Sequence, residues 1–377
     1  MGLRRALGIF KRIVLWGTGV LMLAGIGAFT FAWFRSDNDC ATRRATTVRD
    51  PMQAITFCDY GTSEVLHLEP IEKPVPNDVQ MLIRVRAAAL NPLDWHYLRG
   101  TPYLMRMSTG LRKPVLTQLG VDFAGTVEAV GKGITKFKPG DDVFGVRNGA
   151  FSEYVVARED RGVVALPAGV TFEQAASIPV AGVTALQSLR DKGRMRAGEK
   201  VLINGASGGV GTFGVQLAKA LGAHVTGVCS TRNLEMVRSL GADEVIDYTK
   251  EDFAKSGRQF DLIIDNVGTR PLGDFRRVMT PTGRYVMVGG GGPNDGPWIG
   301  PFGKVIGALL LSPFIKQEMG MMIGDVTPGD LTLIADLIQQ GKVTPVIDRR
   351  YPLREVPAAI AYLEEGHARG KVIITME

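Results

Sequence analysis

The chain has 377 residues, of which 45% are hydrophobic and 22% charged, a length that predicts two or three domains and excludes a mini-protein or a disordered chain. Residues 1–49 hold eight Lys and Arg against two Asp, whereas the remaining residues hold 36 cations and 36 anions. This balanced body lacks the basic face that phosphate neutralisation requires, so we expect no nucleic-acid partner.

An uncharged run of 22 residues occupies positions 13–34, with Trp16 and Trp33 near its ends. A helix of this length spans ~33 Å, and the run predicts an uncleaved, single-pass membrane anchor. The alternatives are a buried core helix and a cleaved or twin-arginine export signal that begins at Arg4-Arg5. Four cations lie on each side of the run, so its orientation stays open, and residues 35–50 form a polar tether.

Three cysteines, Cys40, Cys58 and Cys229, are widely spaced and form no C-x-x-C pair. This spacing indicates neither a disulfide framework nor a zinc knot. We therefore expect all three to be ordinary small apolar residues.

Residues 51–178 contain short β-type segments separated by Gly, Pro, Asn and Asp. They predict a barrel-like or sandwich-like domain with strands over 53–57, 79–87, 125–130 and 151–157. Residues 173–192 are typical of a helical connector. From about residue 200 strands and helices alternate, which predicts a mainly parallel sheet covered by helices.

A glycine-rich turn follows the first strand of this second half. Residues 200–204 predict a buried strand, and residues 212–221 predict a helix of apolar periodicity. Between them lies the turn that we expect to hold a dinucleotide pyrophosphate against the helix start. Its predicted binding residues are Ala206, Ser207, Gly208, Gly209, Val210 and Gly211.

The next strand, over 223–229, lacks the acidic residue that grips the ribose hydroxyls in NAD-specific sites. Ser230 and Arg232 stand in its place and can donate hydrogen bonds to a 2′-phosphate. The sequence therefore favours NADP(H). Because ligands sit beyond the carboxyl ends of parallel strands, Asn266, Val267 and Gly289 are predicted to line the same trough.

Residues 303–324 are strongly apolar and are interrupted by Ser312-Pro313, so they are too short to span a bilayer. Three interpretations stay open for them: a core helix, a dimer surface, or a patch that dips into lipid or shapes an apolar substrate entrance.

Several motifs together resemble the medium-chain dehydrogenase/reductase superfamily, in its zinc-free quinone oxidoreductase-like branch, over residues 51–377. They are residues 91–94 (NPLD), 119–127 (LGVDFAGTV), 137–141 (FKPGD), 182–185 (GVTA), 205–211 (GASGGVG), 240–243 (LGAD) and 370–372 (GKV).

The resemblance implies an α/β fold in which a doubly wound Rossmann domain is inserted into a GroES-like, β-rich catalytic domain. The expected parts are the anchor and tether at 1–50, the catalytic domain at 51–180, the NADP-binding domain at 181–343 and the completion of the catalytic domain at 344–377. Related enzymes are often dimers, so a homodimer is possible. The need for NADPH favours a cytoplasmic location for residues 51–377. An N-terminal signal anchor with its basic end inside would instead export them.

The resemblance also implies that no metal is bound. The positions that hold zinc in the alcohol dehydrogenase branch are Asn91, Val121 and Val180, and none of these side chains ligates zinc as a thiolate or imidazole. Without a Lewis acid, the protein cannot readily stabilise the alkoxide of alcohol–carbonyl interconversion, whereas reduction of an electron-poor acceptor needs less stabilisation of charge.

The expected activity is thus hydride transfer from NADPH to a small apolar quinone or α,β-unsaturated carbonyl. The alternative is an NADPH-binding, membrane-tethered sensor or scaffold with little catalysis. The resemblance places Asn91 and Asp94 beside the nicotinamide, and His96 is a candidate donor to the acceptor. It also suggests Thr184 near the nicotinamide, Tyr248 near the 2′-phosphate and Lys371 near the cofactor.

Overall fold

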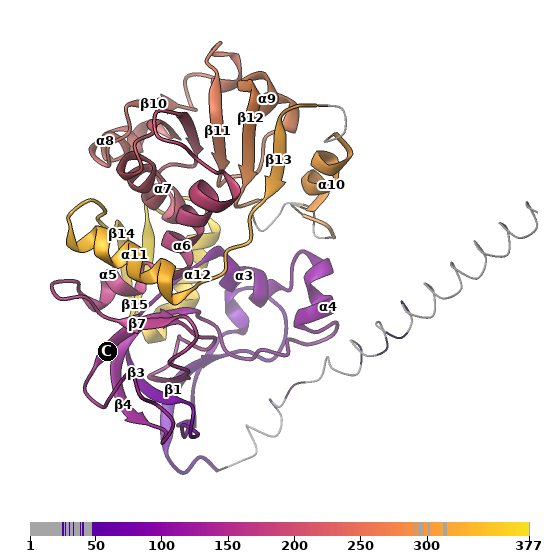
Figure 1. Ribbon diagram of the computed structural model, residues 1–377. Coiled ribbons are helices and arrows are strands. Elements are labelled where there is room, and N and C mark those ends of the chain that lie inside the picture. The colour runs from indigo at the N-terminus through magenta and orange to yellow at the C-terminus, as the bar shows by residue number, and fades with distance from the viewer. Residues whose placement is uncertain are drawn as a thin grey trace, which may run out of the picture.

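The computed structural model describes residues 47–290 and 315–376, together with residues 25, 27, 30, 33, 38, 40, 292, 296, 298–300 and 302–311. Figure 1 shows two lobes, one built on a mostly antiparallel sheet and one on a parallel sheet.

The first lobe carries a seven-stranded sheet in which the strands from the two ends of the sequence meet. Its order is β14-β15-β3-β4-β5-β7, and β6 pairs with β3. The strands are β3 (Met81–Ala89), β4 (Asp122–Val130), β5 (Asp142–Val146), β6 (Tyr154–Ala157), β7 (Val163–Ala165), β14 (Ile347–Pro352) and β15 (Lys371–Thr375). Ile374 of β15 lies opposite Ala88 of β3, so the C-terminal strand pairs with a strand 286 positions earlier in the chain (Figure 1).

A separate hairpin of β1 (Pro51–Thr56) and β2 (His67–Glu72) covers one edge of this lobe. The core of the first lobe contains Phe57, Phe123 and Phe151, all fully buried. The helices of the lobe are α3 (Pro92–Arg99), α4 (Arg106–Thr109), α5 (Phe172–Ala176) and α12 (Val356–Glu364).

The second lobe is a six-stranded parallel sheet of order β10-β9-β8-β11-β12-β13. Its strands are β8 (Lys200–Asn204), β9 (His224–Cys229), β10 (Glu244–Asp247), β11 (Phe260–Asp265), β12 (Met279–Met287) and β13 (Glu318–Met321). Because the chain builds outward from β8 in both directions, the order reverses between β8 and β11. A crevice at the carboxyl ends of strands on either side of such a reversal is the usual ligand site of an open α/β sheet.

Helices cover this parallel sheet and connect it to the first lobe. They are α6 (Pro179–Gln187), α7 (Gly209–Ala220), α8 (Leu234–Ser239), α9 (Leu272–Arg277), α10 (Phe302–Leu311) and α11 (Pro328–Gln339). The largest core cluster includes Ile203 of β8, Phe213 of α7 and Ile334 of α11. It also includes Ala87 and Phe144 of the first lobe, so one apolar core joins the two lobes.

The apolar segment 303–324 is not one element. Helix α10 is followed by strand β13, which pairs with β12 at the sheet edge. Ala308 of α10 is buried, whereas Ile306 and Leu309 are half to two-thirds exposed. A fully buried core helix is therefore excluded for α10, because its apolar side chains face both the protein and solvent.

The predicted membrane location is corrected by the structure. In the part of the chain that is described, no helix combines the length and apolar character needed to cross a bilayer. The predicted span over 13–34 lies outside the described residues except at positions 25, 27, 30 and 33. Hydropathy alone cannot separate a spanning helix from other apolar segments. The prediction of a single-pass membrane protein is therefore not retained.

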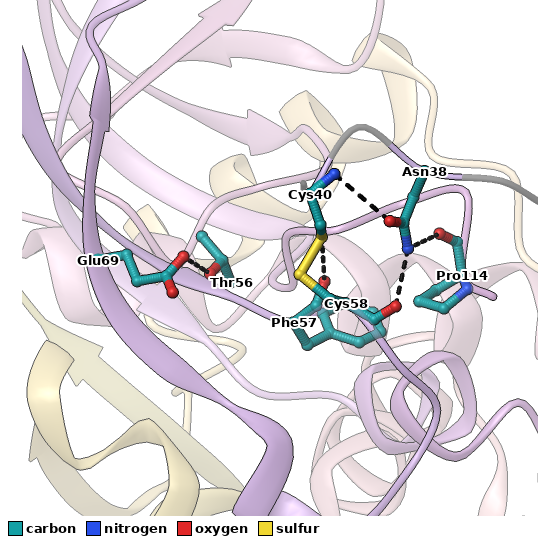
Figure 2. The surroundings of a disulfide bond; sticks show 7 residues. All are labelled: Asn38, Cys40, Thr56, Phe57, Cys58, Glu69 and Pro114. Carbon is teal, nitrogen blue, oxygen red and sulfur yellow. Dashed lines mark hydrogen bonds between the residues drawn. A yellow bond between two sulfur atoms is a disulfide. The ribbon is translucent and has the colours of Figure 1, made fainter. Parts of the chain in front are cut away.

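The expectation for two of the cysteines was wrong. Cys40 and Cys58 form a disulfide across 18 positions, whereas Cys229 is free and buried, with its pKa raised by burial to about 11. Figure 2 shows the bond beside Asn38, whose Nδ2 donates to the carbonyl oxygens of Cys58 at 2.7 Å and Pro114 at 3.2 Å. No local motif marks such a pair, because the chain path alone brings the two residues together.

Candidate active site

The glycine-rich turn lies at the carboxyl end of β8, at the point where the strand order reverses. Gly205 has a φ of +76°, which favours glycine, and Gly208 caps α7 in an extended conformation. A Cβ on Gly211 would lie 2.1 Å from the Gly205 carbonyl oxygen, so the helix packs here without room for a side chain. Around Gly208, in contrast, the nearest atom to a Cβ is 3.6 Å away. The turn thus leaves open space beside the first N–H groups of α7, which have no intrahelical partners.

Two buried side-chain oxygens border this space without a hydrogen-bond partner. They are Oδ1 of Asn233 and Oδ1 of Asn266. The amide nitrogen of Asn233 donates to Ser207 Oγ at 3.0 Å, and that of Asn266 donates to the Asn204 carbonyl at 3.0 Å, so each oxygen has a defined direction. Buried polar atoms are normally paired. The open turn and the two unpaired oxygens together fit a polar ligand such as a dinucleotide.

The floor of the trough is built on Asp265, the last residue of β11, which is fully buried. Its Oδ1 accepts hydrogen bonds from Val267 N at 3.1 Å and Gly268 N at 3.0 Å, which shapes the turn that contains Asn266 and Val267. Its Oδ2 accepts from the hydroxyl of Tyr285 at 2.7 Å, and burial, together with this carboxylate, raises the pKa of Tyr285. Neither Asp265 nor Tyr285 lies in a sequence motif that marks it as a site residue.

Across the turn, Gly289 packs against Asn266, whose carbonyl oxygen would lie 2.5 Å from a Cβ on Gly289. The predicted residues Asn266, Val267 and Gly289 are therefore neighbours in the folded chain.

At the carboxyl end of β9, Ser230 lies beside Asn233, whose Nδ2 is 3.2 Å from Ser230 Oγ. Arg232 is exposed and donates to the His367 carbonyl, and Tyr248 is 54% exposed. A carboxylate that sequence analysis did not consider, Asp247, lies in the neighbouring strand opposite Cys229.

The Asp247 carboxylate is already occupied by local donors. The hydroxyl of Thr231 donates to it at 2.5 Å and that of Thr249 at 2.7 Å, and these bonds lower the pKa of Asp247. The Asp247 carboxylate is therefore hydrogen-bonded by residues near it in the chain. It does not take the role of the acid that binds ribose hydroxyls at the end of the second strand in NAD-specific sites.

On the side of the first lobe, Lys371 of β15 is buried and makes three contacts from its ammonium group. Its Nζ lies 2.8 Å from the Leu90 carbonyl, 2.6 Å from Asn91 Oδ1 and 3.3 Å from Asp122 Oδ2. Burial lowers the pKa of Lys371 and raises that of Asp122, while their mutual attraction opposes both shifts. All three ammonium hydrogens have acceptors, so Lys371 links β15 to the segment before α3 and to the first residue of β4.

The amide of Asn91 is held at both ends by this network. Its Oδ1 accepts from Lys371, and its Nδ2 donates to Asp122 Oδ2 at 3.0 Å. Asp122 also accepts from the backbone of Val180, at the start of α6, at 3.0 Å. The predicted site residue Asn91 is therefore 2% exposed and fixed in orientation by residues that come from β4, α6 and β15.

Asp94 is fully buried at the start of α3. Its two carboxylate oxygens accept from backbone N–H groups, one from Asn91 at 2.7 Å and one from Gly120 at 3.1 Å. Burial raises the pKa of Asp94 to about 7, with a smaller contribution from the charge of Asp122. This carboxylate joins the α3 turn to the segment before β4.

His96 lies two residues further along α3, and its ring stacks on Trp95 with centroids 3.7 Å apart. Its Nδ1 lies 2.6 Å from the Thr101 carbonyl. A carbonyl oxygen only accepts, so Nδ1 carries the hydrogen and Nε2 of the neutral ring is a lone pair. Burial lowers the pKa of His96.

The C-terminal strand also joins the two predicted halves of the site. Gly370 N donates to the Ser207 carbonyl at 2.9 Å, and a Cβ on Gly209 would lie 3.1 Å from Cδ of Lys371. The glycine-rich turn thus touches the Lys371 network directly. Thr184 of α6 lies on a different wall, where its Oγ1 would be 2.7 Å from a Cβ on Gly324.

The resemblance assigns Asn91, Val121 and a position near Val180 to the zinc-ligand positions of the alcohol dehydrogenase branch. Among the residues that the structure describes, no group of three or more His, Cys, Asp or Glu side chains is arranged to hold a metal ion.

Comparisons with known proteins agree with the two-lobed fold. Residues 77–168 match the alcohol dehydrogenase GroES-like domain, and residues 240–374 match the zinc-binding dehydrogenase family. The chain is 34% identical over 340 residues to the chloroplast envelope quinone oxidoreductase homolog of Arabidopsis thaliana, a match covering 86% of this chain and 98% of that protein. It is 35% identical over 357 residues to a trans-enoyl reductase of Aspergillus terreus, which covers 88% and 98% of the two chains.

A solved structure, the quinone oxidoreductase from Coxiella burnetii, superimposes with a TM-score of 0.76 at 31% identity. The match covers 87% of this chain and all of that one.

A GroES-like lobe joined to a Rossmann-like lobe that carries a glycine-rich turn, together with these relatives, defines an NAD(P)H-dependent oxidoreductase. The chain belongs to the medium-chain dehydrogenase/reductase superfamily, in its quinone oxidoreductase-like branch.

Proposed function

We propose that the protein transfers hydride from NADPH to a quinone or an α,β-unsaturated carbonyl. The observation that carries the proposal is the junction of the dinucleotide turn with the Asn91–Asp122–Lys371 network through Gly370 and Ser207. This junction puts the glycine-rich turn in contact with the strand that carries Lys371, which supports a single site shared by the two lobes. Relatives named for quinone reduction and enoyl reduction support the two acceptor classes.

The residues around the turn fit the cofactor. The first N–H groups of α7 face the open space at Gly208, and Oδ1 of Asn233 and Oδ1 of Asn266 are buried acceptors without partners. When bound, the nicotinamide supplies the hydride. Ser230 and Arg232 lie where a 2′-phosphate is expected, and the absence of an acid at the end of β9 removes a source of repulsion. These features support NADPH over NADH.

In the proposed reaction, the protein orients the acceptor and donates a proton. Reduction of a quinone takes one hydride and one proton and yields a hydroquinone. We assign the proton to Nε2 of His96, which carries a hydrogen only when the ring is an imidazolium, because Thr101 holds the hydrogen of the neutral ring at Nδ1.

Asn91, Asp94 and Lys371 are assigned as positioning residues in this proposal. Their polar atoms are engaged with one another, with Asp122 or with backbone groups, so they fix the wall of the site.

The test is NADPH oxidation at 340 nm with 1,4-benzoquinone, a short 2-enal and a simple ketone, with NADH assayed in parallel. We expect turnover of the quinone or the enal, a weak rate with the ketone, and a lower KM for NADPH than for NADH. Tight NADPH binding without turnover of any electron-poor acceptor would instead identify a binding protein with little catalysis.

A further inference from the structure

A cavity of about 360 Å³ lies where the two lobes meet. One wall comes from the ends of β5, β6 and β7, and the other comes from residues 325–328, which precede and begin α11. The lobes are close here, since a Cβ on Gly162 would lie 3.4 Å from the Val326 carbonyl oxygen. Nothing in the hydride-transfer proposal uses this cavity.

The charged side chains that line the cavity are three arginines and two aspartates. Arg158 and Asp160 form two hydrogen bonds with each other, at 2.9 and 2.8 Å, and Arg158 lowers the pKa of Asp160 to about 2. This pair is internally neutral. Arg147 and Arg161 form no ion pair with any carboxylate of the described residues, and the remaining acid is Asp325. The charge of Arg161 also acts on Asp160, so the lining as a whole holds three guanidinium groups against two carboxylates, an excess of one positive charge.

Each wall of the cavity contacts a residue that neighbours a predicted site residue. Arg147 N donates to the Val121 carbonyl at 2.7 Å, and Val121 precedes Asp122 of the buried network. On the opposite wall, Gln187 brackets the backbone of Asp325, donating to its carbonyl at 2.6 Å and accepting from its N–H at 3.1 Å. Gly324, the residue before Asp325, packs against Thr184.

We propose that this cavity binds an anionic oxyacid group carried by the acceptor, such as a carboxylate, sulfonate or phosphate. The planar guanidinium groups of Arg147 and Arg161 are suited to such groups, because each presents several N–H donors in a fixed geometry. The inference rests on the proposed function for the identity of the acceptor. It adds that acceptors with an acidic substituent are preferred over their neutral counterparts.

The test compares two acceptors, 1,4-naphthoquinone and 1,4-naphthoquinone-2-sulfonate, in the wild type and in the double variant R147A/R161A. The ratio of kcat/KM for the sulfonate to kcat/KM for the neutral quinone is compared between the proteins. The intrinsic difference in reactivity between the two quinones is the same in each protein and cancels in this comparison. The matched control is K132A/K136A, which removes two exposed cations of the same lobe that do not line the cavity. We expect the ratio of sulfonate to neutral quinone to fall roughly tenfold in R147A/R161A and to stay unchanged in the control.

A binding measurement makes the inference independent of turnover. Naphthalene-2-sulfonate, which cannot accept hydride, is titrated calorimetrically into the protein with NADP⁺ present, and inorganic phosphate is titrated as a second probe. We expect the Kd of naphthalene-2-sulfonate to rise roughly tenfold in R147A/R161A. Arginine-dependent binding of this probe without turnover of either quinone would contradict the proposed function and leave the cavity assignment standing.

Two results would overturn the inference while the proposed function stands. One is reduction of both quinones with a ratio that the arginine variant does not change. The other is arginine-dependent binding of inorganic phosphate with no such binding of naphthalene-2-sulfonate, which would assign the cavity to a free anion.

Discussion

The Nζ of Lys371 lies 2.6 Å from the Oδ1 of Asn91, a contact between residues 280 positions apart in the chain. It holds the predicted nicotinamide wall to the last strand, and that strand also touches the dinucleotide turn through Gly370. The C-terminal residues therefore connect the two halves of the site. The same contact leaves Lys371 with no spare hydrogen for a cofactor phosphate, since Leu90 and Asp122 accept the others.

Replacing Lys371 by methionine should destabilise the protein by about 3–5 kcal/mol, because the buried charge of Asp122 would lose the opposite charge beside it. The double variant K371M/D122N removes that charge and should recover part of the loss. Urea unfolding of the two single variants and the double variant measures the coupling between the residues. Additive losses would show that the ion pair contributes no specific stabilisation.

Two glycines of the same turn should respond differently to alanine. Gly208→Ala places a Cβ in open space at an ordinary φ of −83°, so the protein should fold with an unchanged Tm. The methyl group would occupy the expected approach of the pyrophosphate, and the KM for NADPH should rise. Gly211→Ala would put a Cβ 2.1 Å from the Gly205 carbonyl, so its Tm should fall. Equal effects of the two substitutions on Tm would contradict this description of the turn.

Ser230→Asp should shift the preference of the enzyme from NADPH towards NADH. It introduces a carboxylate at the end of β9, which repels a 2′-phosphate and can bind ribose hydroxyls. We expect the ratio of kcat/KM for NADPH to that for NADH to fall at least about tenfold, or roughly 1.4 kcal/mol. Ser239→Asp adds the same charge at an exposed position of α8 and is the control. A similar change in both variants would assign the effect to net charge alone.

The pH dependence of quinone reduction should report His96. Burial lowers the pKa of this ring below its ordinary value of 6.5, and Nε2 carries a proton only below that pKa. As pH rises through the lowered pKa, kcat/KM should fall, and this limb should be absent in His96→Phe. A wild-type profile that is flat below pH 6.5, or a limb that persists in the variant, would exclude His96 as the proton donor.

Loss of the Cys40–Cys58 disulfide should lower thermal stability. In the chain-entropy description, a bond that closes a loop of this length lowers the conformational entropy of the unfolded chain and so stabilises the folded state by about 3 kcal/mol. Cys58→Ser and reductant treatment of the wild type should therefore lower Tm to a similar extent, as followed by circular dichroism. Cys229→Ser, which leaves the bond intact, is the control for reductant effects on the free thiol. An unchanged Tm in Cys58→Ser would show that the bond does not stabilise the fold.

The amino-acid sequence by itself determined the glycine-rich turn, the family and the parallel sheet around residues 200–290. These features depend on neighbours in the chain: a buried strand, then Gly208 and Gly211, then an amphipathic helix. Local periodicity and glycine spacing express such contacts directly. Over 303–324 hydropathy does not distinguish the helix α10 from the edge strand β13, because both elements have the same apolar composition.

Only the tertiary structure decided which polar groups meet. Lys371 pairs with Asp122, Asp265 pairs with Tyr285, and Cys40 pairs with Cys58, and none of these partners lies in the same local motif. Their contacts arise from strand order and from the return of β15 to β3. The cavity at Arg147 and Arg161 has the same origin, since the packing of one lobe on the other creates it. A one-dimensional pattern does not encode such pairings, because burial and proximity are properties of the folded chain.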